Sequence, residues 1–389
     1  MIIFVVSGVD LSYQDGGRTH LLEKWTRVAA EGHEVDLWAF AGQSSPDWSP
    51  LTVHAPRHLP VRGLAGPSYS ASLLASVLWH LRRRRPDAIH VRLAQPTVPV
   101  ALALRRLSTV PVVVEVTGPI AEEARLYGVS ERKVALIRSI SERAMQAAAA
   151  VVAVTDGIKR QLVAEYGVAE QAVHVVGNGV NTEVFRPRPT AEARARLGLQ
   201  GRGPIVGFVG NLHRWQGTEF LIEAAPAILS SVSDAEIHLV GDGVTRESLE
   251  RSASRLGIRD RVRFHGQVPY DDVPDFIAAC DVLVAPLLAK PTGDSGYSPL
   301  KLYEYLSSGR PVVASRLDGL EVVEREGLGR LVPPADADAL ARAVVELLAD
   351  DQARVEMGER ARRIAMELFG WGRAAERTIE ILQGVARPR

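Results

Sequence analysis

Short runs of hydrophobic residues alternate along the chain with longer segments in which hydrophobic residues recur every three or four positions. In the first half, such runs predict buried strands at residues 2–6, 35–39, 86–91, 112–116 and 150–154. The longer segments predict helices, one of them from about His20 to Glu31, where Gly32 ends it. Strands that alternate with helices in this way predict a parallel β-sheet with crossover helices.

The same alternation starts again after a segment of different character, residues 186–203. That segment is rich in proline, charge and glycine, which predicts a linker with one short helix. Hydrophobic runs that predict strands then return at residues 205–209, 236–240, 261–265, 282–285 and 311–314. We therefore expect an α/β protein with two Rossmann-like domains, residues 1–185 and 186–369, and an amphipathic helix in residues 370–389 that packs back on the first domain.

Composition narrows the function classes. At 389 residues the chain is too long for one ordinary hydrophobic core. Its formal net charge is zero, which argues against a nucleic-acid partner held mainly by charge. A single cysteine, Cys280, excludes an internal disulfide framework and fits the reducing cytoplasm. No hydrophobic run approaches the ~20 residues that span a bilayer, so we expect a cytoplasmic protein.

The first domain carries a local excess of arginine. Between His54 and Val110 there are nine arginines and a single acidic residue, Asp87. The nine are Arg57, Arg62, Arg82, Arg83, Arg84, Arg85, Arg92, Arg105 and Arg106. Because four of them are consecutive and follow a hydrophobic helix, this zone suits an anionic membrane surface or a lipid acceptor that carries phosphate. The alternative is a solvated helix end whose cations complement the helix dipole.

Glycine-rich loops follow several predicted strands, at the positions where ligands bind in open α/β sheets. Asp15-Gly16-Gly17-Arg18-Thr19 follows the first strand and precedes a helix. Its backbone N–H groups can approach an anion there, or the glycines can simply form a tight turn. In the second half, similar loops follow three successive strands, at residues 210–217, 241–243 and 265–268. Arg214 is the one permanent cation of the first of these loops.

The segment from Gly293 to Pro311 carries the most specific chemistry. Ser298 or a neighbour can cap a helix whose first turn holds Pro299, and free N–H groups at such a helix end bind a diphosphate. Lys301 adds a positive charge there, and it is one of five lysines against 41 arginines. Glu304 lies on nearly the same helix face, where its carboxylate can accept hydrogen bonds from ribose hydroxyls. The alternative is an ordinary surface Lys–Glu pair.

These motifs resemble glycosyltransferase family 4. The resemblance rests on Asp15-Gly16-Gly17, Asn178-Gly179-Val180, Gly241-Asp242-Gly243 and Ser298-Pro299-Leu300-Lys301-Leu302-x-Glu304-Tyr305, in the family's order along nearly the whole chain. It implies the GT-B fold, in which two Rossmann-like domains face each other across a donor-binding cleft. It also implies a retaining glycosyltransferase that needs no metal or other cofactor. Such an enzyme moves a sugar from a nucleotide-diphosphate sugar to an acceptor hydroxyl, in the biosynthesis of glycans, the cell envelope or glycolipids.

The resemblance and the loop positions together give a set of expected site residues. The residues expected to bind the donor are Gly16, Gly17, Asn211, Asp242, Gly266, Val268, Ser298, Leu300 and Glu304. The residues expected to act in catalysis are Lys301, Arg214, Arg92 and Glu115. By resemblance, Gly16 and Gly17 face the diphosphate from the first domain, and Lys301 holds it from the second together with the backbone of Leu300. Glu304 then binds the ribose, and the loop at residues 266–268 lies near the base.

The chain departs from the family pattern at three places. The loop after the first strand of the second domain usually offers an arginine and a lysine, but those positions are Asn211 and Gln216 here. Arg214 is the possible substitute. Gly296 stands where the family's paired-glutamate motif has its first glutamate, and the first-domain histidine of many members has no match near Arg92.

Two other functions are compatible with the same sequence motifs. A GT-B sugar-nucleotide epimerase would need an acid and a base at the sugar and no acceptor, whereas a non-catalytic subunit would keep the fold without turnover. The sequence Asp336-Ala-Asp338 precedes a hydrophobic helix, so we interpret it as a helix cap rather than a metal site. The expected partners are a nucleotide-sugar donor, a glycan or lipid-linked acceptor, and the cytoplasmic face of an anionic membrane. No nucleic acid is expected.

Overall fold

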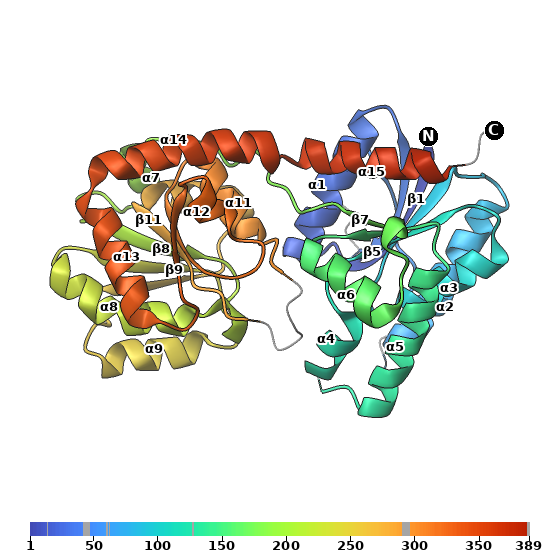
Figure 1. Cartoon of the computed structure of the whole chain (residues 1–389), viewed down its shortest axis with the longest axis horizontal. Helices are drawn as coiled ribbons and strands as arrows, with labels where there is room; N and C mark the ends of the chain where they lie inside the picture. The colour runs from blue at the N-terminus through green and yellow to red at the C-terminus, as the bar shows by residue number, and fades with distance from the viewer. Residues whose placement is uncertain are drawn as a thin grey trace. The chain divides into compact units, whose positions relative to one another are not determined.

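The computed structural model describes residues 1–13, 15–41, 47–59, 61, 63–126, 128–289 and 296–386. Its contacts divide the described residues into two compact units. Unit 1 holds the residues up to Asn178, Gly296, and the residues from Trp371 onward, and unit 2 holds the rest (Figure 1). Two parts of the predicted features, Arg62 of the basic zone and residues 293–295 of the phosphate-binding segment, lie outside the described residues.

Unit 1 is built on a seven-stranded parallel sheet with the order β3-β2-β1-β4-β5-β6-β7. The strands are β1 (Ile2–Asp10), β2 (Glu34–Phe40), β3 (Thr52–His54), β4 (Ala88–Arg92), β5 (Val112–Val116), β6 (Ala150–Ala153) and β7 (Val173–Val175). The helices are α1 (Gly16–Ala30), α2 (Ala65–Leu81), α3 (Val98–Leu107), α4 (Ile120–Leu126), α5 (Glu131–Gln146), α6 (Asp156–Tyr166), the short 3₁₀ helix η1 (Glu170–Ala172) and α15 (Trp371–Val385). The C-terminal helix α15 lies beside α1 (Figure 1).

Unit 2 is built on a six-stranded parallel sheet with the order β10-β9-β8-β11-β12-β13. The strands are β8 (Ile205–Val209), β9 (Glu236–Val240), β10 (Val262–Gly266), β11 (Val282–Ala285), β12 (Val312–Ser315) and β13 (Gly329–Val332). The helices are α7 (Thr190–Arg196), η2 (Arg214–Gln216), α8 (Thr218–Ser231), α9 (Arg246–Arg255), η3 (Tyr270–Asp272), α10 (Val273–Ala279), α11 (Leu300–Ser307), α12 (Val322–Arg325), α13 (Ala337–Ala349) and α14 (Asp351–Leu368). Helices α8 and α13 pack side by side (Figure 1).

Both sheets are buried on their two faces, which is why their strands read as continuous hydrophobic runs. In unit 2, Ile205 and Val209 of β8 belong to one buried hydrophobic cluster. Val206 and Phe208 of the same strand belong to a second cluster. Because side chains alternate across a strand, the two clusters cover opposite faces of the sheet. Each sheet also changes strand order at its first strand, between β1 and β4 in unit 1 and between β8 and β11 in unit 2. Such switch points are where ligands bind in this class of sheet.

The predicted α/β class with two Rossmann-like halves is confirmed, while the start of the first helix was predicted too late. Helix α1 begins at Gly16, because the Asp15 side chain caps it by accepting a hydrogen bond of 2.8 Å from the Arg18 N–H. Two glycines in the first turn weaken the helical pattern in the sequence and hide this start. None of the helices in the described part of the chain is long and apolar enough to cross a bilayer.

Candidate functional site

The loops after β8, β9 and β10 of unit 2 meet at the carboxyl end of the sheet, and glycines allow them to do so. The Gly210 N–H donates to the Val240 carbonyl at 2.9 Å, and the Gly241 N–H donates to the Gly266 carbonyl at 2.8 Å. Gly241 has a φ of +125°, and a Cβ there would lie 2.0 Å from the Gly210 carbonyl oxygen. Only glycine fits such a position. Three predicted site loops are thereby held against one another.

Lys301 lies where α11 meets the end of β8. Its ammonium donates to the Gln216 Oε1 at 2.5 Å and lies 4.0 Å from the centre of the Phe208 ring. The Tyr305 hydroxyl fixes the helix to the strand, since it accepts from the Val209 N–H at 2.8 Å and donates to the Val209 carbonyl at 3.0 Å. A Cβ on Gly210 would come within 2.6 Å of the Lys301 Nζ. Glycine at this position therefore leaves room for the ammonium.

The surroundings of Lys301 act on the charge of its ammonium in opposite directions. Burial lowers the pKa of Lys301 to about 7, and the charge of Glu304 on the same helix opposes this shift. A diphosphate beside the ammonium would stabilise its protonated form further. The N-terminus of α11 adds positive potential at the same place, because Lys301 is the second residue of that helix.

The prediction that Ser298 or a neighbour caps α11 is wrong. Pro299 occupies the cap position, and no described side chain makes a capping hydrogen bond there. The Ser298 hydroxyl lies 3.2 Å from the Tyr303 hydroxyl instead. Proline fixes the backbone at the helix start without a cap, so the first-turn N–H groups of α11 are not engaged by a capping side chain.

The remaining predicted residues of unit 2 lie along the same edge. Asn211 and Arg214 are exposed in the loop after β8, and the Leu212 N–H of that loop donates to the Asp242 carbonyl at 2.9 Å. The Asp242 carboxylate accepts from the Gly243 N–H at 2.7 Å and from Arg246 at 2.9 Å, and these contacts lower its pKa. Asp242 therefore shapes its own loop. Val268 is partly buried against the hydrophobic cluster of unit 2.

In unit 1 the structure brings three of the four predicted site residues together. Gly16 and Gly17 form the first turn of α1, and Arg92 at the end of β4 donates to the Gly17 carbonyl at 2.9 Å. Burial lowers the pKa of Arg92, and the charges of Glu115 and Asp15 oppose this. The guanidinium thus holds the glycine turn against the carboxyl end of the sheet.

The fourth residue, Glu115 on β5, belongs to a buried ion-pair cluster that also contains Lys24, His20 and Asn178. Glu115 is fully buried, and its Oε1 accepts a hydrogen bond from the Lys24 ammonium and lies 3.1 Å from the His20 Nε2. Burial raises the pKa of Glu115, but Lys24 and His20 together outweigh this and hold the pKa well below its usual value. The Lys24 Nζ is also 3.1 Å from the His20 Nε2, and the His20 Nδ1 is 2.6 Å from the Asn178 Oδ1.

Comparison with known families covers most of the chain in two adjacent parts. Residues 14–184 match the family described as Glycosyltransferase Family 4. Residues 203–350 match the family described as Glycosyl transferases group 1. The chain belongs to glycosyltransferase family 4. The first match falls largely within unit 1, and the second falls largely within unit 2.

Individual relatives agree with this membership. The chain is 34% identical over 210 residues, 53% of its length, to the GDP-mannose-dependent alpha-(1-6)-phosphatidylinositol monomannoside mannosyltransferase of Mycolicibacterium smegmatis, and the match covers 55% of that protein. It spans about half the length of this relative and of the next two curated proteins it matches. A D-inositol 3-phosphate glycosyltransferase of Corynebacterium glutamicum is 27% identical over 381 residues, which cover 92% of this chain and 89% of the relative.

The fold of this family 4 chain is also that of a solved structure. Sucrose-phosphate synthase from Thermosynechococcus elongatus superposes with a TM-score of 0.80 at 23% identity, over 99% of this chain and 98% of that one. The two parallel Rossmann-like sheets are those of the GT-B fold. The fold expected from the resemblance is therefore confirmed.

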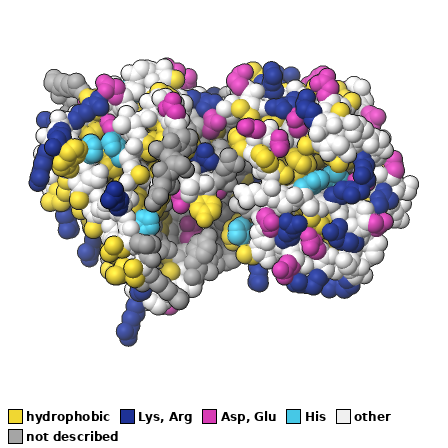
Figure 2. Space-filling view, turned by 180° about the vertical axis from the view of Figure 1, so that it is seen from behind, with side chains coloured by type: hydrophobic (Ala, Val, Ile, Leu, Met, Phe, Trp, Pro, Cys, Tyr) yellow, Lys and Arg dark blue, Asp and Glu magenta, His cyan; other side chains and the backbone are white. Residues whose placement is uncertain are grey.

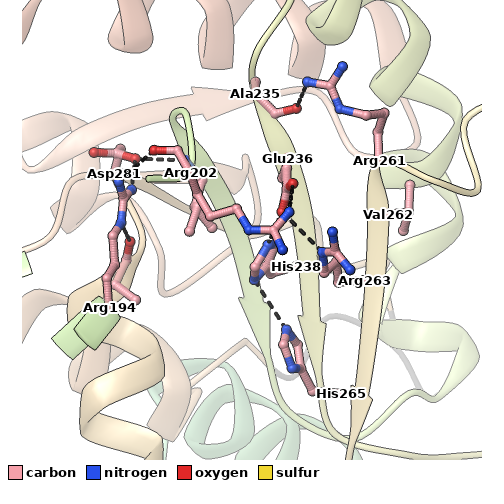
Figure 3. Close-up of polar contacts among 12 residues, drawn as sticks. Arg194, Arg202, Ala235, Glu236, His238, Arg261, Val262, Arg263, His265 and Asp281 are labelled. Atoms are coloured by element: carbon pink, nitrogen blue, oxygen red, sulfur yellow. Dashed lines mark hydrogen bonds and ion pairs between the residues drawn. The ribbon is translucent and has the colours of Figure 1, made fainter. Parts of the chain in front are cut away.

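Unit 2 of this family 4 chain contains a second polar cluster, which extends toward the loop at residues 266–268 that is expected to lie near the nucleobase. Figure 3 shows Arg202, His238 and Arg263 pointing toward Glu236 on β9, and they donate to its carboxylate at 2.5, 3.0 and 3.2 Å. Burial raises the pKa of Glu236, but these contacts outweigh it and hold the pKa at about 2. His265, one residue before Gly266, lies 3.1 Å from His238. The cluster therefore extends from Glu236 at the start of β9 to His265 near the end of β10.

Sequence reasoning missed His20, Lys24 and the partnership of Lys301 with Gln216. His20 and Lys24 are four residues apart and therefore share one face of α1. A signal was present, because Lys24 is one of only five lysines in an arginine-rich chain. Polar residues four apart on a helix are, however, more often found on its solvent face.

Proposed function

We propose that this protein is a retaining glycosyltransferase that moves a sugar from a nucleotide-diphosphate sugar to an acceptor hydroxyl. The observation that carries the proposal is the position of Lys301 at the start of α11, hydrogen-bonded to Gln216 beside the glycine loop after β8. The leaving nucleoside diphosphate gains negative charge during transfer, and a positioned ammonium next to helix N–H groups stabilises that charge. Retention is proposed from family membership.

The donor contacts follow from the same edge of unit 2. We propose that the diphosphate binds Lys301 and the backbone at Leu300, that Glu304 accepts hydrogen bonds from the ribose, and that the loop at residues 266–268 lies near the base. Arg214 is exposed in the neighbouring loop. It is the candidate to replace the positive charge that family members usually carry where this chain has Gln216. In unit 1, Arg92 donates to the Gly17 carbonyl, and we propose that the Gly16–Gly17 turn held in this way faces the diphosphate.

A thermal-shift screen with UDP, GDP, ADP and dTDP, followed by incubation with the matching nucleotide sugars, tests the proposed function. A bound nucleotide stabilises the folded protein by mass action, so the correct base raises the melting temperature most. Transfer to an acceptor, or hydrolysis of the matching donor with its anomeric configuration kept, is the expected result. An epimerised donor would point to an epimerase, and the absence of nucleotide binding would point to a non-catalytic subunit.

We expect transferase activity to survive EDTA. The proposed stabilisers of the diphosphate are the Lys301 ammonium and helix N–H groups, which need no divalent cation. Asp336 of the one Asp-x-Asp sequence is used elsewhere, since its carboxylate caps α13 by accepting from the Ala339 N–H at 2.8 Å. Initial rates with and without chelator check this. Complete loss in EDTA that Mg²⁺ or Mn²⁺ restores would contradict it.

We further propose an anionic, glycan or lipid-linked acceptor at the cytoplasmic face of a membrane. The two relatives described above are named for acceptors that contain an inositol phosphate. In unit 1, the end of α2 offers a fitting surface. Trp79 is 48% exposed, and the Arg83 guanidinium stacks 3.3 Å from the centre of its ring. Figure 2 shows Lys and Arg side chains beside hydrophobic ones along the outer edge of unit 1, at the left of that view.

Binding to anionic vesicles is expected to depend on three of the four consecutive arginines. Arg82, Arg83 and Arg85 are exposed, whereas Arg84 pairs with Glu34 and Asp36. At about 1 kcal/mol per cation near an anionic surface, replacing the three exposed arginines by glutamine should weaken binding roughly a hundredfold. Co-sedimentation with phosphatidylcholine vesicles, with and without phosphatidylglycerol and at two salt concentrations, measures this. Arg84→Gln is the matched control, and equal losses in both variants would argue against the proposed surface.

A further inference from the structure

His20 contacts two of the places where the chain passes between the units. The unit boundaries fall between Asn178 and Gly179 and between Gly370 and Trp371. The His20 Nδ1 lies 2.6 Å from the Asn178 Oδ1. The His20 ring also lies edge-on to the Trp371 indole, with ring centres 5.4 Å apart and planes at 89°. The buried His20 side chain of α1 therefore contacts the unit 1 residue at each of these two boundaries, which are called the chain crossings below.

The contacts of His20 join β5 to Asn178. The Asn178 Oδ1 can only accept, so the His20 Nδ1, 2.6 Å away, donates to it. The His20 Nε2 lies 3.1 Å from both the Lys24 ammonium and the Glu115 Oε1, and Lys24 also donates to Glu115. Polar contacts therefore run without a break from β5 through α1 to Asn178.

The same helix carries the Gly16–Gly17 turn at its start. His20 lies about one helical turn beyond these glycines, and Arg92 holds the Gly17 carbonyl at 2.9 Å. Nothing flexible separates the turn from His20, since both belong to one continuous helix, Gly16–Ala30. A shift of Asn178 or Trp371 relative to α1 therefore acts directly on the element that bears the glycine turn.

We propose that His20 is a positioning residue that couples the two chain crossings, at Asn178 and Trp371, to the Gly16–Gly17 turn. The catalytic consequence rests on the proposed function, in which that turn faces the diphosphate. The buried ion pair of Lys24 and Glu115 holds the His20 ring in its orientation. Loosening the bond to Asn178 leaves the donor contacts of unit 2 intact but disorders the turn during turnover.

Three variants of the full chain test this coupling. Asn178→Ala removes the acceptor for His20, Asn178→Asp keeps an acceptor oxygen at the same place, and Asn181→Ala is the control. Asn181 lies just past the boundary and accepts from the Glu183 and Val184 N–H groups at 3.2 and 3.3 Å within its own turn. We expect Asn178→Ala to lower kcat roughly tenfold with little change in the donor KM, the size that a small misplacement at a reacting centre produces. Asn178→Asp should stay within roughly threefold of the parent, as should Asn181→Ala.

Hydrogen–deuterium exchange gives a readout that does not require activity. Amides at the start of α1, residues 16–20, should exchange faster in Asn178→Ala than in the parent, the aspartate variant or the control. Unchanged exchange there would overturn the coupling, as would equal loss of kcat in Asn178→Ala and Asn181→Ala or failure of the aspartate to restore it. If the parent itself transfers no sugar, the proposed function fails, and the exchange data still decide whether His20 couples the crossings to the turn.

Discussion

Replacing Lys301 by alanine should lower kcat/KM by about 10²–10³, the loss expected when one stabiliser of developing charge is removed. The ammonium lies beside Gln216 and the face of Phe208, in the first turn of α11, so the alanine variant loses the cation of this position. Steady-state kinetics with the donor found in the nucleotide screen measure the change. Lys133→Ala, at an exposed lysine on α5, is the matched control and should turn over like the parent. A Lys301→Ala protein with parental kcat/KM would mean that the donor site is elsewhere.

The pH profile of the parent should report the same group. With the Lys301 pKa lowered to about 7, the free protein loses this charge as the pH rises above that value. The diphosphate binds the protonated form, so kcat/KM, which reflects the free enzyme, should fall on the alkaline side of pH 7. Lys301→Arg keeps its charge throughout this range and should remove the alkaline fall while retaining part of the activity. A fall that persists unchanged in Lys301→Arg would assign it to another group.

The fold was predictable because each strand is buried on both faces. β8 reads as an unbroken hydrophobic run, since Ile205 and Val209 fill one cluster and Val206 and Phe208 fill the other. The start of α1 was not predictable from the same pattern. Its first turn consists of glycines, which have low helix propensity, and only the capping bond of Asp15 places the helix there.

The candidate site was predictable where residues close in sequence form it, and less so where distant residues meet. Lys301 and Glu304 share one helix, so their proximity follows from helical spacing. The contact of Lys301 with Gln216 joins residues 85 positions apart and depends on how β8 and α11 pack. The arginine zone shows the same limit, because nothing in Arg82–Arg85 as a sequence distinguishes Arg84, which pairs with Glu34 and Asp36, from its exposed neighbours.

Lys24→Met is expected to destabilise the protein by about 3–5 kcal/mol, the usual result of removing one partner from a buried ion pair. Glu115 is fully buried and Lys24 is 1% exposed, so methionine would fill the space of the lysine stem while leaving the carboxylate without its cation. Urea unfolding at pH 7 measures the loss. Arg125→Met breaks an ion pair with Glu131 whose partners are both exposed, and it should change stability little.

Two further measurements separate the lost charge pairing from lost packing. Replacing Glu115 by leucine in the Lys24→Met protein removes the unpaired charge and should recover much of the stability, because an apolar pair of similar volume is often as stable as a buried ion pair.

The pH dependence of the stability difference between Lys24→Met and the parent also has an expected sign. In the parent the lowered pKa of Glu115 keeps its contribution to stability constant above about pH 4.5 and removes it only at lower pH. In Lys24→Met, burial without the cation raises that pKa, so the carboxyl takes up a proton in the folded state as the pH falls. The deficit relative to the parent should therefore shrink between pH 7 and about pH 4.5. A deficit that stays constant over this range, and that the Glu115→Leu change does not reduce, would indicate that Lys24 stabilises unit 1 through packing and not through its charge.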